Sequence, residues 1–143
     1  MVTVAFYNNF LYDLALGRFN LDADTFKVML VNGYTYNATH TSKSQITGEL
    51  LTENGYTAGG ETIPNPTITE TSGVVKWDGD DVTWTATGGD IGPATGAVIY
   101  NDTVTSPEAD RLVCYIDFGD EESAGASTQF KIVFNSNGIA TIG

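Results

Sequence analysis

The chain has 143 residues, 41% of them hydrophobic and 11% aromatic, which is enough apolar surface to build one core. A single β-rich domain over residues 1–143 is therefore expected, and an intrinsically disordered chain is excluded. The 18 acidic residues outnumber the 6 basic ones, which are scattered, and the formal net charge is −12. Nucleic acid and anionic membrane surfaces are unsuitable partners for such a chain, because both are held by clustered basic side chains.

The N-terminal segment is apolar and carries no charged side chain before Asp13. It lacks the basic start of a signal peptide, and the polar residues Asn8 and Asn9 interrupt it, so neither a signal peptide nor a membrane span is expected. Two interpretations stay open: an edge strand of the domain's own sheet, or an arm that adds to the sheet of a neighbouring subunit. Under both, the candidate partner-binding residues are Met1, Val2, Thr3, Val4 and Ala5.

A short helix is predicted over residues 9–16. Asn8 is expected to cap its start, and Gly17 can adopt the left-handed conformation that ends helices. The apolar face of this helix is predicted to hold Phe10, Leu11 and Leu14. Alternating apolar residues then predict a strand over residues 25–31, which ends at an Asn-Gly pair.

Residues 33–66 have weak periodicity and are rich in Thr, Asn, Ser and Gly. A long irregular region inside a compact domain is uncommon unless it is functional, so we expect this loop to contact a partner. Tyrosine buries a large ring at low entropic cost while its hydroxyl keeps a polar partner. The candidate anchors in this loop are Tyr34, Tyr36 and Tyr56.

The clearest predicted hairpin joins residues 73–77 to residues 82–85. A four-residue loop through Asp78-Gly79-Asp80-Asp81 keeps the apolar side chains of both strands on one face, whereas a two-residue Asp-Gly turn does not. That face is predicted to hold Val75, Trp77, Val82 and Trp84.

Further strands are predicted over residues 97–100, 112–118, 129–134 and 139–142, with residues 120–126 as a polar connection. Many short strands separated by Gly-rich turns are typical of sandwiches and barrels. The predicted fold is therefore mainly β, sandwich or barrel-like, with one short N-terminal helix.

Catalytic chemistry is difficult to build from this set of residues. His40 is the one histidine and lies in the polar loop, and no Gly-x-Ser-x-Gly elbow accompanies it. Cys114 is expected to be a small buried apolar residue. The acidic run at residues 78–81 lacks the other ligands of a calcium loop, because position 12 counted from Asp78 is Gly89. We therefore expect no enzyme activity, no metal site and no cofactor.

Five motifs occur in order along nearly the whole chain: residues 21–31, 55–60, 80–84, 97–100 and 112–119. They resemble the "DTxKVxLV", "GYTAGG", "DDVTW", "AVIY" and "AYIDFG" motifs of a family of small tailed-bacteriophage virion proteins. In the last motif, Cys114 stands where the family has a small residue.

The resemblance implies a non-enzymatic structural protein of the phage virion. It points to a capsid decoration or cement protein that binds the major capsid protein on the capsid exterior, after synthesis in the host cytoplasm, with self-association as a dimer or trimer. Two alternatives stay open: a tail component, and a carbohydrate- or receptor-binding module of the virion. A hydrolase of unknown kind is a third, more distant alternative, which a pocket holding a carboxyl group of shifted pKa would favour.

Overall fold

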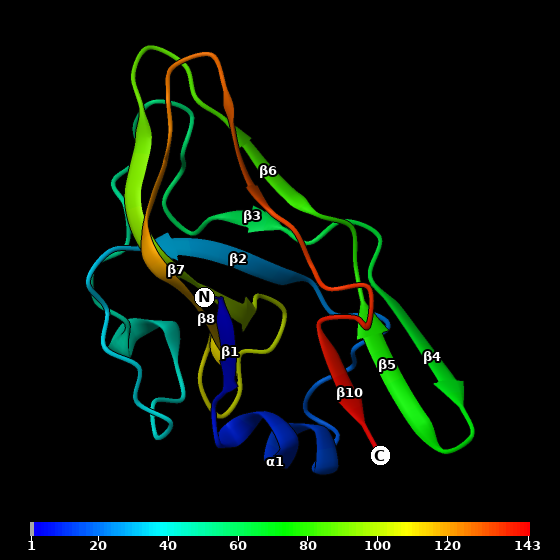
Figure 1. Ribbon diagram of the computed structural model, residues 1–143. Helices are drawn as coiled ribbons and strands as arrows, with labels where there is room; N and C mark the ends of the chain where they lie inside the picture. The colour runs from blue at the N-terminus through cyan, green and yellow to red at the C-terminus, as the bar shows by residue number, and fades with distance from the viewer. Residues whose placement is uncertain (1) are drawn as a thin grey trace.

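Three antiparallel sheets and one α-helix form the part of the chain described by the computed structural model, residues 2–143 (Figure 1). The strands are β1 (Thr3–Phe6), β2 (Phe26–Val31), β3 (Glu61–Thr62), β4 (Thr67–Thr71), β5 (Val74–Asp78), β6 (Val82–Thr85), β7 (Ile91–Asn101), β8 (Arg111–Ala124), β9 (Gln129–Ile132) and β10 (Ala140–Ile142). Strand residues make up 44% and helical residues 7% of the structure, so the prediction of a mainly β fold with one short N-terminal helix is confirmed.

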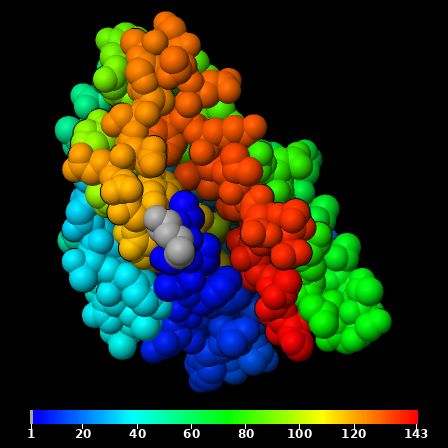
Figure 2. Space-filling view, viewed as in Figure 1, coloured from blue at the N-terminus to red at the C-terminus, as the bar shows by residue number. Residues whose placement is uncertain are grey.

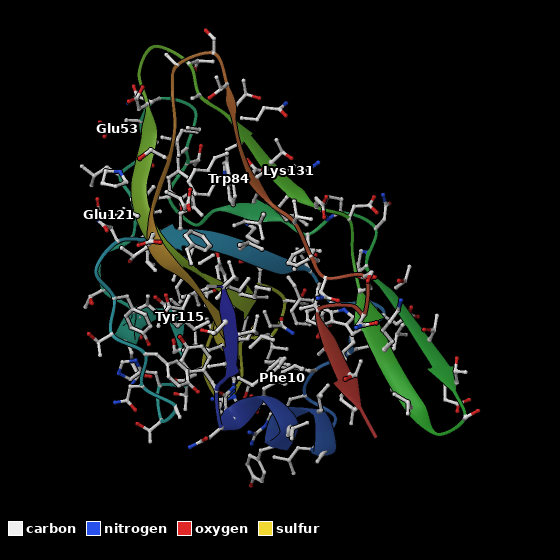
Figure 3. The ribbon with its side chains drawn as sticks, viewed as in Figure 1. Phe10, Glu53, Trp84, Tyr115, Glu121 and Lys131 are labelled. Atoms are coloured by element: carbon white, nitrogen blue, oxygen red, sulfur yellow. The ribbon has the colours of Figure 1, made fainter. Side chains whose placement is uncertain are left out.

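The sheets contain five, three and two strands, in the orders β1-β8-β7-β2-β3, β10-β5-β4 and β6-β9. The two smaller sheets lie against one face of the five-stranded sheet. The main core fills the space between them, where Trp84 and Phe10 point inward (Figure 3). Phe10, Phe26 and Trp77 meet there, with the rings of Phe26 and Trp77 edge to face at 4.7 Å between centroids.

A second apolar cluster covers the other face of the five-stranded sheet. Its buried members are Tyr7, Met29, Val31, Tyr34, Val98, Tyr100, Leu112 and Tyr115, and the partly buried Tyr36 and Ile46 pack against them. The irregular region after β2, which contains only the short 3-10 helix Lys43–Gln45, supplies three of these side chains. Because both of its faces are covered, β2 is buried at five of its six positions.

The helix α1 (Asn9–Ala15) begins where predicted and is followed by Gly17 with φ +71°, as predicted. Asn8 occupies the N-cap position, as predicted, but its side chain makes no capping hydrogen bond. The predicted apolar face is correct for Phe10, which is buried, and for Leu14, which packs against the core. It is wrong for Leu11, which is 59% exposed.

The predicted hairpin between residues 73–77 and 82–85 is wrong. β5 pairs with β4 on one side and β10 on the other, and β6 pairs with β9. The tight turn at Ser72 and Gly73 explains why β5 pairs with β4. Both residues have positive φ (51° and 85°), as two-residue hairpin turns require. The chain after β5 crosses to another sheet instead of reversing. Trp77 and Trp84 still meet in one core, as buried residues of two sheets.

β8 is longer than predicted. Residues 120–124, predicted to be a polar connection, continue the strand and pair with β7 as far as Ile91 opposite Ala124. Three register irregularities along β7 and β8 interrupt the strict alternation that the prediction assumed. β8 therefore projects well past Thr3 at the start of β1, which pairs with it only between residues 114 and 117.

Candidate functional site

The N-terminal segment forms β1, which pairs antiparallel with β8 from Thr3 opposite Asp117 to Phe6 opposite Cys114. No strand of the described chain pairs with the other side of β1, which is therefore an edge of the five-stranded sheet. Of the two interpretations of this segment, the edge strand is confirmed for residues 3–6. The candidate Met1 lies outside the described residues, and Val2 directly precedes the strand.

On the unpaired edge of β1, the backbone groups of Val4 are free, whereas the Phe6 carbonyl already accepts a hydrogen bond. The Tyr7 amide donates to the Val113 carbonyl at 3.1 Å. Because inward and outward backbone groups alternate along an antiparallel strand, the amide and carbonyl of Val4 and Phe6 face away from β8. The Tyr36 hydroxyl donates to the Phe6 carbonyl at 2.5 Å. The hydrogen-bonding groups of Val4 remain available on this edge.

Exposed apolar side chains gather on the same segment. Ten large hydrophobic residues of the described chain are exposed, and six of them come from residues 2–16: Val2, Val4, Phe6, Leu11, Tyr12 and Leu16. We call these six residues the N-terminal face. Figure 2 shows this blue segment uncovered on one side of the molecule, from the middle of the view down to α1. A segment with this many exposed apolar side chains is a candidate binding surface.

A groove of about 750 Å³ runs beside β1. Val2 and Val4 line one side of it, and Ile116 and Phe118 of β8 lie on the same sheet. The opposite side is formed by residues 129–135, 138 and 139, which belong to β9 and the connection to β10. The groove is therefore the opening between the edge of the large sheet and the smaller sheets.

A buried ionic cluster fixes α1 against β8. The Asp13 carboxylate is fully buried and accepts hydrogen bonds from Arg111 Nε at 2.8 Å and Asn9 Nδ2 at 2.7 Å. Arg18 Nη1 donates to its other oxygen at 3.1 Å. Burial alone raises the pKa of Asp13, but the hydrogen bonds from Arg111, Asn9 and Arg18 outweigh it and hold that pKa below the ordinary value. This cluster sets the position of the N-terminal face.

Two of the three tyrosines predicted to anchor a partner are internal, so that prediction is wrong for them. Tyr34 is 7% exposed and Tyr56 is 2% exposed. The Tyr56 hydroxyl donates to Glu49 and accepts from the Leu30 amide, both at 3.0 Å. The Gly-rich loop returns onto the sheet, where internal partners satisfy these hydroxyl groups. The sequence of this loop has no periodic pattern that would distinguish buried tyrosine rings from exposed ones.

Tyr36 is half-buried, and it covers the β1 edge instead of standing free. Its ring stacks on that of Tyr115, with 9° between the ring planes. His40 belongs to the same region, where its Nδ1 lies 2.8 Å from the Tyr34 hydroxyl. This histidine therefore supports the loop.

Cys114 is fully buried, as predicted, and burial raises the pKa of its thiol to about 12. Since the thiolate is the reactive form, we expect no reaction with a thiol reagent such as dithionitrobenzoate in the native protein at neutral pH. In denaturant the same thiol should react fully. Rapid labelling of the native protein, followed by absorbance, would contradict the burial of this strand position.

The acidic run at residues 78–81 is engaged within the protein. Asp78 lies 3.7 Å from Lys76 Nζ, Asp81 lies 3.5 Å from Lys131 Nζ, and Asp80 accepts from the Asn65 amide group at 2.7 Å. Within residues 2–143 no group of three or more His, Cys, Asp or Glu side chains is arranged to hold a metal ion.

Comparisons with protein-family models, with curated proteins and with solved structures gave no match to this chain. In the described part of the chain, no helix has the length and apolar character needed to cross a membrane.

Proposed function

We propose that this protein is a non-enzymatic structural component of a tailed-phage particle, a decoration or cement protein that binds the major capsid protein lattice through its N-terminal face. The observation that carries the proposal is the concentration of exposed apolar side chains on residues 2–16. The order of the five motifs that resemble phage virion proteins supports the same assignment.

The physical properties of the chain suit this role. A decoration protein has to stay soluble before assembly and then gain free energy by covering the joints between capsid subunits. The net charge of −12 favours the first property. Burial of the N-terminal face against a partner supplies the second, at roughly 25 cal/mol for each Å² of apolar surface removed from water. On the particle, copies of the chain are proposed to associate as dimers or trimers.

Charge placed on the N-terminal face is expected to weaken attachment strongly without unfolding the domain. Leu11→Lys and Val2→Lys replace side chains that are 59% and 62% exposed, so the thermal midpoint should stay close to that of the natural chain. Binding to undecorated phage heads, measured by cosedimentation, should fall at least about tenfold. Leu51→Lys, at the most exposed large apolar position among the described residues, is the matched control and should bind normally.

Two outcomes would contradict the proposal. Loss of binding in the Leu51 variant together with normal binding in the Leu11 and Val2 variants would place the contact elsewhere. Antibody labelling of intact virions, imaged by electron microscopy, should decorate the head, and labelling confined to the tail would identify a tail component instead.

A further inference from the structure

We propose that the groove beside β1 takes an extended segment of the partner protein, apolar at alternate positions and basic at one end, which adds to the free edge of β1 as a sixth strand of the large sheet. The proposal rests on the proposed function, because it assigns the kind of partner segment that the N-terminal face binds. It specifies the backbone contacts, the side-chain spacing and the charge of that segment.

The backbone contact is limited to the start of β1. The outward amide and carbonyl of Val4 have no partner strand, whereas the Phe6 carbonyl is already taken by the Tyr36 hydroxyl. An added strand therefore has to pair around Val4 and Val2 and end before Phe6. Addition of a strand to an open sheet edge is a common way to bind an extended peptide, with backbone hydrogen bonds for affinity and alternate side chains for specificity.

The groove supplies apolar contacts for every second side chain of the added strand. Side chains of a strand alternate between the two faces of its sheet, and Val2 and Val4 occupy the groove side of β1. Across the groove stand Val133, which is 68% exposed, with Phe134 and Ile139. Side chains of the added strand that lie on the same face as Val4 would fill the space between these two walls.

The charge around the groove is negative at one end. β8 carries Asp117 opposite Thr3 and continues past it with Asp120, Glu121 and Glu122, and none of these four carboxylates forms an ion pair within residues 2–143. Glu122 lines the groove itself. Among the described residues that line the groove, the one basic side chain is that of Lys131, and it is paired with Asp81. A basic group at this end of the partner segment would therefore meet the Glu122 carboxylate in the groove, with Asp120 and Glu121 beside it on β8.

These positions also set the direction of the segment. Thr3 lies opposite Asp117, and the other three carboxylates continue beyond it. A strand that runs antiparallel to β1 ends near Thr3, so its basic residues should follow its apolar ones. Antiparallel pairing is the more stable and more frequent arrangement.

The test uses a fluorescent, end-blocked peptide of alternating valine and threonine that ends in lysines, titrated with the full chain and followed by anisotropy. It should bind at least about tenfold more tightly than the same peptide ending in glutamates, and binding should weaken with salt. Val4→Pro removes the outward amide without touching the bonds to β8, and Val4→Ala keeps that amide. The Pro variant should bind at least about tenfold more weakly than the Ala variant.

A peptide with methylated backbone amides tests the backbone hydrogen bonds to β1 without changing the protein. It replaces the Val4→Pro comparison if that variant does not fold. Equal binding of the methylated and plain peptides would overturn strand addition. Equal binding of the lysine and glutamate peptides would overturn the charge assignment, and no binding of any peptide would overturn the whole inference.

Sedimentation tests whether a second copy of the chain occupies the β1 edge. A dimer of the natural chain that is lost in the Val4→Pro variant would show this and would also overturn the inference. The proposed function is judged separately, by attachment to phage heads. If phage heads bind the chain but no peptide does, the proposed attachment through the N-terminal face stands and only the proposal of an added strand is overturned.

Discussion

Replacement of Trp84 by alanine is expected to lower the free energy of unfolding by about 3–5 kcal/mol. Trp84 is 2% exposed and lies in the main core, where its ring centroid is 5.8 Å from that of Tyr56 and 6.2 Å from that of Phe130. It connects the two-stranded sheet to the loop that covers the large sheet. Removal of the indole leaves a cavity that the strand backbones on both sides cannot close.

Denaturant unfolding of the Trp84→Ala protein, followed by circular dichroism, measures this loss. Trp84→Phe is the matched control. This variant keeps a ring in the core. It removes an indole N–H that has no hydrogen-bond partner among the described residues, so its loss of unfolding free energy should be much smaller. A loss below about 1 kcal/mol for the alanine variant would mean that Trp84 is on the surface and would restore the case for a binding module.

Asp13→Asn is expected to lower the free energy of unfolding by about 3–5 kcal/mol at neutral pH. The change preserves the shape of the side chain but removes the fully buried one of the two carboxylates that Arg111 contacts, leaving only Glu108, and it weakens the contact with Arg18. The exposed ion pair of Lys27 and Asp102, at 3.4 Å, supplies the control. Asp102→Asn should cost about 1 kcal/mol or less, because water screens that pair.

Acid should reduce the effect of Asp13→Asn. The pKa of Asp13 is lowered in the folded protein, so its stabilising contribution is complete above the ordinary carboxyl pKa of about 4 and is lost as the pH falls through the lowered value. The difference in unfolding free energy between the natural chain and the variant should therefore shrink as the pH falls below about 4. A difference that stayed constant from neutral to strongly acidic pH would show that the Asp13 carboxylate is not the source of the stability.

The local elements were predictable from the sequence, and their partners were not. The alternation over residues 25–31 and 129–134 correctly indicated β2 and β9, because the side-chain period of a strand is visible locally. The pairing of β5 depended on a turn at Ser72 and Gly73, where a serine with positive φ carries little sequence signal. The full length of β8 was not predicted either, because the bulges along β7 and β8 interrupt the alternation of apolar and polar residues.

The candidate site was predicted in part. The apolar, uncharged start of the chain left two alternatives, an edge strand or an arm to a neighbouring subunit, and residues 3–6 form the edge strand. The groove could not be foreseen, because its far wall comes from residues 129–139, which only the tertiary fold brings close to Val2 and Val4. The burial of Tyr34 and Tyr56 depends on hydroxyl partners that lie elsewhere along the chain, such as Tyr7 and Glu49.

The short edges of the large sheet also protect the protein from unwanted polymerisation. An unpaired strand is a template for fibril growth, and the hazard increases with its length. At one side β1 has four residues, and the Tyr36 hydroxyl occupies the outward carbonyl of the last of them. At the other side β3 has two residues, one of them Glu61. Neither border of the large sheet offers a run long enough to pair with the large sheet of another copy, so this sheet should not grow edge to edge into a fibril.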